Sequence, residues 1–147
     1  MATIKAFTDL EQSRKLAEIL PPENADMKWY FWKSEIDAPK TPTFGYSKTA
    51  AECYKDTEAI YLPCWSLAAL LNLLPNEIST GERYCDKYQI DIRKYDGGDN
   101  TTLYQIAYGN NRGLSGSWHD MINTSEKESA IDTCYEMIIL LNELKML

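Results

Sequence analysis

The sequence predicts an α+β domain with a small antiparallel sheet of three to five strands and three helices. Three observations support this class. Apolar residues recur at helical spacing near both ends of the chain, alternate strictly in its middle, and form one almost continuous apolar stretch between these parts. An antiparallel sheet with helices packed on one face is the simplest arrangement that buries all three. A chain of 147 residues is expected to form a single domain, 1–147.

The first predicted helix begins at a capping box made by Thr8 and Glu11 and ends at two consecutive prolines. The aromatic segment 27–33 that follows is predicted to be a strand. Both faces of this strand carry aromatic side chains. We therefore expect it to be central in the sheet or to be covered by the following loop, Asp37 to Thr49.

A short extended segment, 59–62, leads to a central helix. Pro63 suits the first position of that helix, which is predicted over 64–74. Only Ser66 and Asn72 are polar in it, and a helix without a polar face must be buried on most sides.

The middle of the chain predicts a β-hairpin. Residues 88–93 and 102–108 both alternate with a period of two, and the segment 96–100 between them has the composition of a turn. Residues 118–122 are expected to add a further short strand.

The last predicted helix is long and runs from Glu126 or Ser129 to the end of the chain. Its apolar residues repeat at spacings of three and four, which predicts a core-facing stripe. The stripe consists of Ala130, Cys134, Met137, Leu141 and Leu144, with Ile131 and Ile138 beside it.

The charge and hydropathy of the chain argue against two kinds of partner, nucleic acid and the lipid bilayer. It has 22 acidic and 15 basic residues, a net charge of −7, so non-specific binding to nucleic acid is not expected. The acidic C-terminal part is interpreted as a solvated helix face, or alternatively as a nucleic-acid mimic. No segment is apolar enough to span a bilayer, and no signal peptide is predicted.

The cysteines indicate a reducing compartment, so a cytoplasmic location is predicted. No two of them are close enough for a metal-binding pair, and His119 is the single histidine, so no metal site is expected. We expect the four thiols to be reduced and buried. They are Cys53, Cys64, Cys85 and Cys134.

The sequence lacks the common catalytic and phosphate-binding motifs, and it names no reaction. It contains no nucleophile elbow, P-loop or Rossmann fingerprint. We therefore predict no catalytic residue and no cofactor, and a non-enzymatic binding or protein-interaction module.

An alternative hypothesis is a site for a small, nucleotide-like ligand on a glycine-containing loop. A flat aromatic ring, a guanidinium and several amides and hydroxyls can recognise a planar or anionic ligand. The competing interpretation is a polar hairpin loop whose Trp118 packs inward. The candidate residues are Asn110, Asn111, Arg112, Ser115, Trp118 and His119.

The last helix also predicts a homodimer. If Glu136 marks the middle of its polar face, Ile139, Leu140 and Leu147 lie on or near that side and are candidates for a two-fold interface. The alternative is that Leu140 is a singly exposed residue.

Three stretches carry a resemblance to other proteins. They are Lys15–Pro21, Cys64–Leu71 followed by Leu74-Pro75, and Ala130–Leu144 with Cys134-Tyr135-Glu136-Met137 and Asn142-Glu143-Leu144-Lys145. In these helical core segments the chain resembles small uncharacterised proteins of Bacteroides-type bacteria and their phages and mobile elements. Those proteins often have a histidine where this chain has Asn142, which argues against a catalytic role for that position. The resemblance implies a mobile-element accessory protein and provides no site residues.

Overall fold

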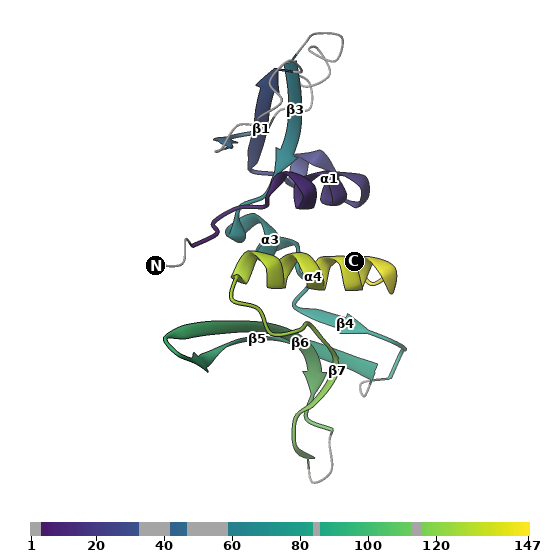
Figure 1. The fold of residues 1–147 in the computed structure, drawn as a ribbon. Coiled ribbons are helices and arrows are strands. Elements are labelled where there is room, and N and C mark those ends of the chain that lie inside the picture. Colours follow the sequence, from purple (N-terminus) through teal and green to yellow (C-terminus); the bar gives the residue numbers. More distant parts are fainter. Residues whose placement is uncertain (1–3, 33–41, 47–58, 84–85, 113–115) are drawn as a thin grey trace. The chain divides into compact units, whose positions relative to one another are not determined.

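The computed structural model describes residues 4–32, 42–46, 59–83, 86–112 and 116–147 (Figure 1). The α+β class is confirmed, but the described strands form two antiparallel sheets, of three and four strands, where we expected one. The chain divides into two compact units, Ala6–Leu71 and Met1–Lys5 with Asn72–Leu147. The single domain remains a prediction. In chain order the elements are α1 (Leu10–Ile19), η1 (Pro22–Asn24), β1 (Met27–Trp32), β2 (Thr43–Phe44), β3 (Ala59–Cys64), α3 (Leu67–Leu73), β4 (Glu77–Ser79), β5 (Lys87–Gly98), β6 (Thr101–Asn110), β7 (His119–Asn123) and α4 (Ala130–Glu143).

Helix α1 begins one residue later than its predicted cap implies. The N-cap is Asp9, whose side chain accepts a hydrogen bond from the backbone N–H of Gln12, while the Gln12 side chain accepts one from the backbone N–H of Asp9. The capping box predicted for Thr8 and Glu11 is therefore wrong. The reason is that the Thr8 side chain is fully buried and bonds to other groups.

The sheet of the unit Ala6–Leu71 has the order β2-β1-β3, so β1 is central among the described strands. This agrees with the first of the two positions expected for this aromatic strand, central in the sheet or covered by the following loop. Its other side carries Tyr30 and Trp32, which are exposed. The loop that was predicted to cover it lies outside the described residues except for 42–46. The buried side of β1 is formed by Met27, Trp29 and Phe31.

The central helix is shorter than predicted because Pro63 belongs to β3 and α3 begins only at Leu67. Strand β3 is at the edge of the described sheet, a position that tolerates proline. In α3, Leu70 is fully buried but Ala68 and Asn72 are exposed. The helix therefore has an exposed side that its composition did not predict.

Buried hydroxyl groups tie α1 to β1 and to the end of β3. Thr8 Oγ1 accepts a hydrogen bond from the backbone N–H of Trp65 at 3.1 Å and shares a second one, 2.7 Å long, with Ser13 Oγ. Ser13 Oγ in turn accepts a bond from the indole nitrogen of Trp29 at 3.2 Å. Thr8 and Ser13 are fully buried. Buried polar groups of this kind are costly when they lose their partners, so the network fixes α1 on this sheet.

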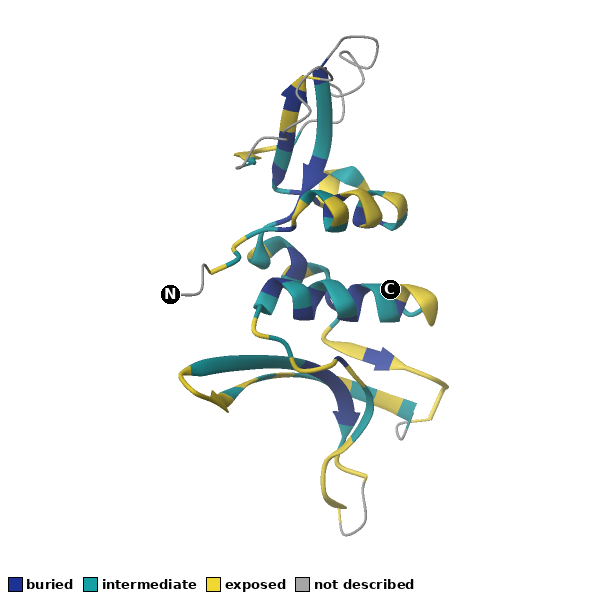
Figure 2. Cartoon of the chain, in the orientation of Figure 1, coloured by how far each residue is buried: buried dark blue, intermediate teal, exposed yellow. Residues whose placement is uncertain are grey.

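The other unit contains the order β4-β5-β6-β7, and the predicted hairpin is confirmed as β5 and β6. Its turn consists of Asp99 and Asn100, which both have positive φ (51° and 60°), as the favoured two-residue hairpin turn requires. The predicted strand 118–122 is confirmed as β7 to within one residue. Helix α4 packs on β6, where Ile106 and Tyr108 are buried (Figures 1 and 2).

Helix α4 begins at the N-cap Ser129 and ends at Glu143, four residues before the end of the chain. Lys145 has a φ of 57°, and the backbone N–H groups of the two residues after Leu144 bond to carbonyls of the last turn. This arrangement is a Schellman motif, which ends a helix. Leu144 is consequently 50% exposed, so its predicted place in the core stripe is wrong. The helical position predicted for Leu147 is also wrong.

The described cysteines agree with the expectation of reduced, buried thiols. Cys64 and Cys134 are free and buried. Burial raises the pKa of the Cys134 thiol to about 12, and it also raises the pKa of Cys64. Cys53 and Cys85 lie outside the described residues.

The hydroxyl network predicts a large effect of a nearly isosteric change. Thr8→Val should lower the free energy of unfolding by about 1–3 kcal/mol, because the Trp65 N–H and Ser13 then lose a buried partner. Urea unfolding measures this. Thr43→Val, at an exposed position of β2, is the matched control and should change stability by less than about 0.5 kcal/mol. Equal stabilities of the two variants would contradict the role of the network.

Candidate functional site

An ion pair joins β5 to β7 across the face of the four-stranded sheet that lies away from α4. Arg93 donates to both carboxylate oxygens of Asp120, at 2.9 and 2.6 Å. Its Nε donates to Asp91 at 2.7 Å, and Nη1 also donates to the Gln105 carbonyl oxygen at 3.1 Å. The side chains of Arg93 and Asp120 are 27% and 23% exposed. Forked, partly buried pairs of this type are strong and directional.

The ion pair keeps both of its members charged. Hydrogen bonds from Arg93 lower the pKa of Asp120 to about 2, against a smaller opposing effect of burial. The same contact raises the pKa of Arg93 further above its ordinary value.

Trp118 is held by this ion pair and by a glycine. Its indole nitrogen donates to Asp120 Oδ1 at 2.6 Å. A Cβ atom on Gly109 would lie 2.7 Å from the indole Cε2 atom and 2.4 Å from the carbonyl oxygen of His119, so the ring can rest here only because position 109 has no side chain. Trp118 is 37% exposed. The expectation that it packs inward is therefore wrong: the ring lies on the backbone of β6 and remains partly open to solvent.

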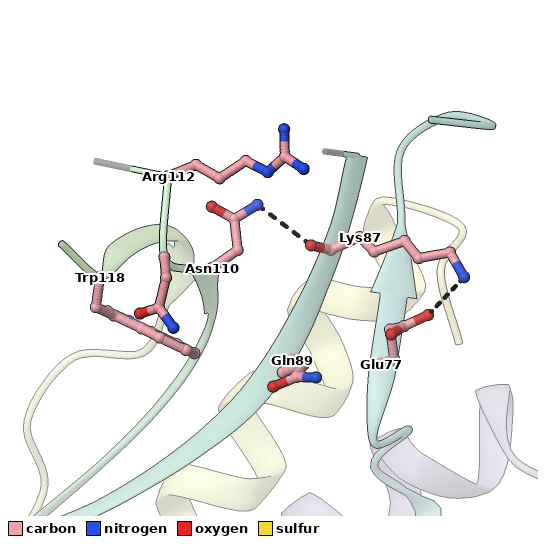
Figure 3. Close-up of a pocket in the computed structure, with 7 residues that line it drawn as sticks. Glu77, Lys87, Gln89, Asn110, Arg112 and Trp118 are labelled. Atoms are coloured by element: carbon pink, nitrogen blue, oxygen red, sulfur yellow. Dashed lines mark hydrogen bonds and ion pairs between the residues drawn. The ribbon is translucent and has the colours of Figure 1, made fainter. Parts of the chain in front are cut away.

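A pocket of about 360 Å³ opens beside Trp118 (Figure 3). Asn110 Nδ2 donates to the backbone carbonyl of Lys87 at 3.2 Å, which fixes the Asn110 amide against β5. Lys87 Nζ lies 3.5 Å from Glu77 Oε1, and both side chains are almost half exposed. The pocket is lined by Glu77, Lys87, Gln89, Asn110, Asn111, Arg112 and Trp118. These residues include two bases and one acid, a net charge of +1 in a chain whose net charge is −7.

The structure brings together four of the six candidate residues predicted from the sequence. Asn110, Asn111, Arg112 and Trp118 all line the pocket. His119 pairs with Asn110 in the β6–β7 ladder, but it is exposed and is not a lining residue. Ser115 lies outside the described residues.

The sequence did not identify the wall of the pocket that β4 and β5 form. Gln89 and Lys87 come from β5, and Glu77 comes from β4, whose short pairing with β5 no sequence pattern indicated. The sequence pattern could have identified Gln89, because this residue alternates with Asp91 and Arg93 along the predicted hairpin and therefore shares their face of the sheet.

Two of the predicted interface residues lie on α4, and the third lies beyond its end. Ile139 and Leu140 are half-buried, whereas Leu147 is exposed. Glu136, the supposed middle of the polar face, is paired with Lys127 at 2.8 Å and accepts hydrogen bonds from Ser125. Burial of Glu136 is outweighed by these contacts, so its pKa lies below the ordinary value.

Comparisons with known proteins give no relative. No protein-family model, no curated protein and no solved structure matches the chain. Within the described parts of the chain, no helix is both long and apolar enough to cross a membrane. The same residues contain no cluster of three or more His, Cys, Asp or Glu side chains that would hold a metal ion.

The ion pair predicts a pH dependence of stability. Because the pKa of Asp120 falls from its ordinary 3.8 to about 2 on folding, its ionised form stabilises the protein fully above pH 3.8. This contribution is lost as the pH falls from 3.8 to about 2. Asp120→Asn should therefore lower the free energy of unfolding markedly at pH 6 and by only about half as much at pH 3, as measured by urea unfolding.

Asp99→Asn at the hairpin turn is the control for the loss of one negative charge, because Asp99 is exposed. If Asp120→Asn lowers the free energy of unfolding by the same amount at the two pH values, the ion pair between Arg93 and Asp120 is contradicted.

Proposed function

We propose that the chain is a binding module that holds a small anionic ligand in the pocket beside Trp118. The observation that carries the proposal is the concentration of donors and positive charge there, on an otherwise acidic chain. Arg112 offers a planar fork of N–H donors, which suits a phosphate or carboxylate group. A volume of about 360 Å³ is within the usual range for small-molecule sites.

Lys87 supplies the second positive charge. Its contact with Glu77 is long, at 3.5 Å, and both side chains are almost half exposed. Exposed pairs of this kind contribute little stability. A bound anion therefore competes with Glu77 for Lys87 at small cost, whereas the Asn110 amide stays in place through its bond to the β5 backbone.

The proposed role is binding without catalysis. This part of the proposal rests on the sequence, which contains no recognisable nucleophile–base pair around its single histidine. We also propose a role as an accessory protein of a phage or mobile element, which rests on the sequence expectation for the three helical segments alone, since no family model, curated protein or solved structure matches the chain.

Ribose 5-phosphate is a simple probe of the anionic site. At a hundred times its dissociation constant, a specific ligand stabilises the folded protein by about 2.7 kcal/mol. We expect this compound to raise the melting temperature of the wild type. Arg112→Gln should need at least about ten times more ligand for the same increase in melting temperature, because it removes the forked donors.

Arg14→Gln is the matched control, since it removes the same charge from an exposed position of α1. The proposal fails if no phosphate- or carboxylate-bearing compound in a metabolite panel stabilises the wild type, or if Arg112→Gln responds like Arg14→Gln.

We propose second that the chain forms a homodimer through the end of α4 and the residues that follow it. It is supported by Leu144 and Leu147, which are 50% and 45% exposed, next to the half-buried Leu140. The two residues are three positions apart in the chain, and exposed apolar side chains that form one contiguous patch favour a contact with another apolar surface.

Leu147→Glu tests the dimer because Leu147 is exposed and lies beyond the helix, so the fold should tolerate the change. We expect sedimentation velocity to show a dimer for the wild type and a monomer for the variant. A wild type that is monomeric at high concentration contradicts this proposal.

A further inference from the structure

We infer that the ligand of this pocket is an aromatic anion whose ring stacks on Trp118, and that Asp120 is the residue that positions Trp118 for it. The inference rests on the proposed function and goes beyond it in two respects. It names the chemical class of the ligand, a planar ring joined to a phosphate or carboxylate. It also assigns a role to a residue that does not line the pocket.

The first step is the orientation of the indole. One side of the ring rests on Gly109, close enough that a Cβ atom there would overlap two indole carbons, at 2.7 and 2.8 Å. Trp118 is nevertheless 37% exposed and lines the pocket. Figure 3 shows the indole almost edge-on at one side of the pocket, with Asn110 and Arg112 beside it. The ring is therefore available as a flat wall for a second planar group.

The second step is the fixation of that wall. The bond from the indole nitrogen to Asp120, at 2.6 Å, restricts rotation of the ring about its side-chain bonds. Asp120 itself is held by the two bonds from Arg93, and Arg93 is held by Asp91. A partly exposed tryptophan on an unsupported loop would lose rotamer freedom when a ligand binds. Here the ion pair has already restricted the ring, so stacking costs less.

The third step concerns the rest of the ligand. The rest of the pocket lining supplies the Gln89 amide and the part of the Asn110 amide that is not bonded to Lys87, and these offer donors and acceptors to the edge of a ring. Lys87 and Arg112 supply the positive charge. Stacking surface, amides and cations together fit a nucleoside monophosphate or a similarly built aromatic anion better than they fit an aliphatic phosphate.

Two probes separate this inference from the proposed function. By titration calorimetry, adenosine 5′-monophosphate should bind the wild type roughly 5- to 150-fold more tightly than ribose 5-phosphate, which is the affinity that one stacked base adds. Equal affinities would overturn the stacking inference and leave the anionic site intact. Failure of both compounds to bind would overturn the proposed function, and the inference with it.

The positioning role is tested by the ratio of the two affinities. Trp118→Leu should abolish the preference for adenosine 5′-monophosphate. Asp120→Asn should reduce it severalfold while ribose 5-phosphate binds as before, because the phosphate contacts of Arg112 and Lys87 are unchanged. If Asp120 only supports the fold, both affinities fall together and the ratio stays constant, which contradicts the inference.

Trp118→Phe keeps a stackable ring but removes the donor to Asp120, so it provides the test if Asp120→Asn does not fold. The account predicts a reduced affinity ratio for Trp118→Phe. A ratio equal to that of the wild type would show that the bond to Asp120 does not position the ring.

Discussion

The ion pair between Arg93 and Asp120 is the interaction on which the open face of the four-stranded sheet depends. It connects β5 to β7 over the intervening strand β6, where small residues leave room for it: Gly109 has no side chain, and Ala107 has only a methyl group. Ala107 is fully buried, although it lies on the face away from α4, which is the result expected if the bridging side chains cover it. The same carboxylate then holds Trp118, so one interaction sets both the sheet face and the wall of the pocket.

This dependence explains why the pocket is a feature of the strands more than of the loop. Gln89 is fixed by the pairing of β5 with β4 and β6, Lys87 by the pairing of β5 with β4, and Asn110 by its bond to the Lys87 backbone. Trp118 belongs to the segment just before β7, but the ion pair ties it to the sheet. Sites on regular elements keep their geometry better than sites on unsupported loops. The site is therefore largely pre-formed.

The sequence was sufficient where a local pattern determines the structure. Strict alternation and the turn composition predicted β5 and β6, and the spacing of apolar residues predicted most of the core stripe of α4. The Asn110–Arg112 loop and Trp118 were recognised as a candidate site because their chemistry is concentrated in one stretch. The partners across the sheet were not, because the register of β4 and the meeting of Arg93 with Asp120 are long-range features that no local pattern contains.

The errors have physical causes of the same kind. Thr8 has the right side chain for a cap, but a buried network uses its hydroxyl and leaves the cap to Asp9. Proline is equally suited to the start of a helix and to an edge strand. For Pro63, only the pairing of β3 with β1 distinguishes the two. The end of α4 was placed too late, because Lys145 adopts a left-handed conformation that is usually associated with glycine or asparagine.

The central claim is that Arg93, acting through Asp120, fixes the ring of Trp118. The indole N–H resonance of Trp118, assigned by its disappearance in Trp118→Phe, reports on this bond directly. We predict that this proton exchanges slowly with water despite the 37% exposure of the residue, and that Arg93→Gln shifts its resonance and speeds the exchange. An indole proton that exchanges as fast in the wild type as in Arg93→Gln would contradict the account.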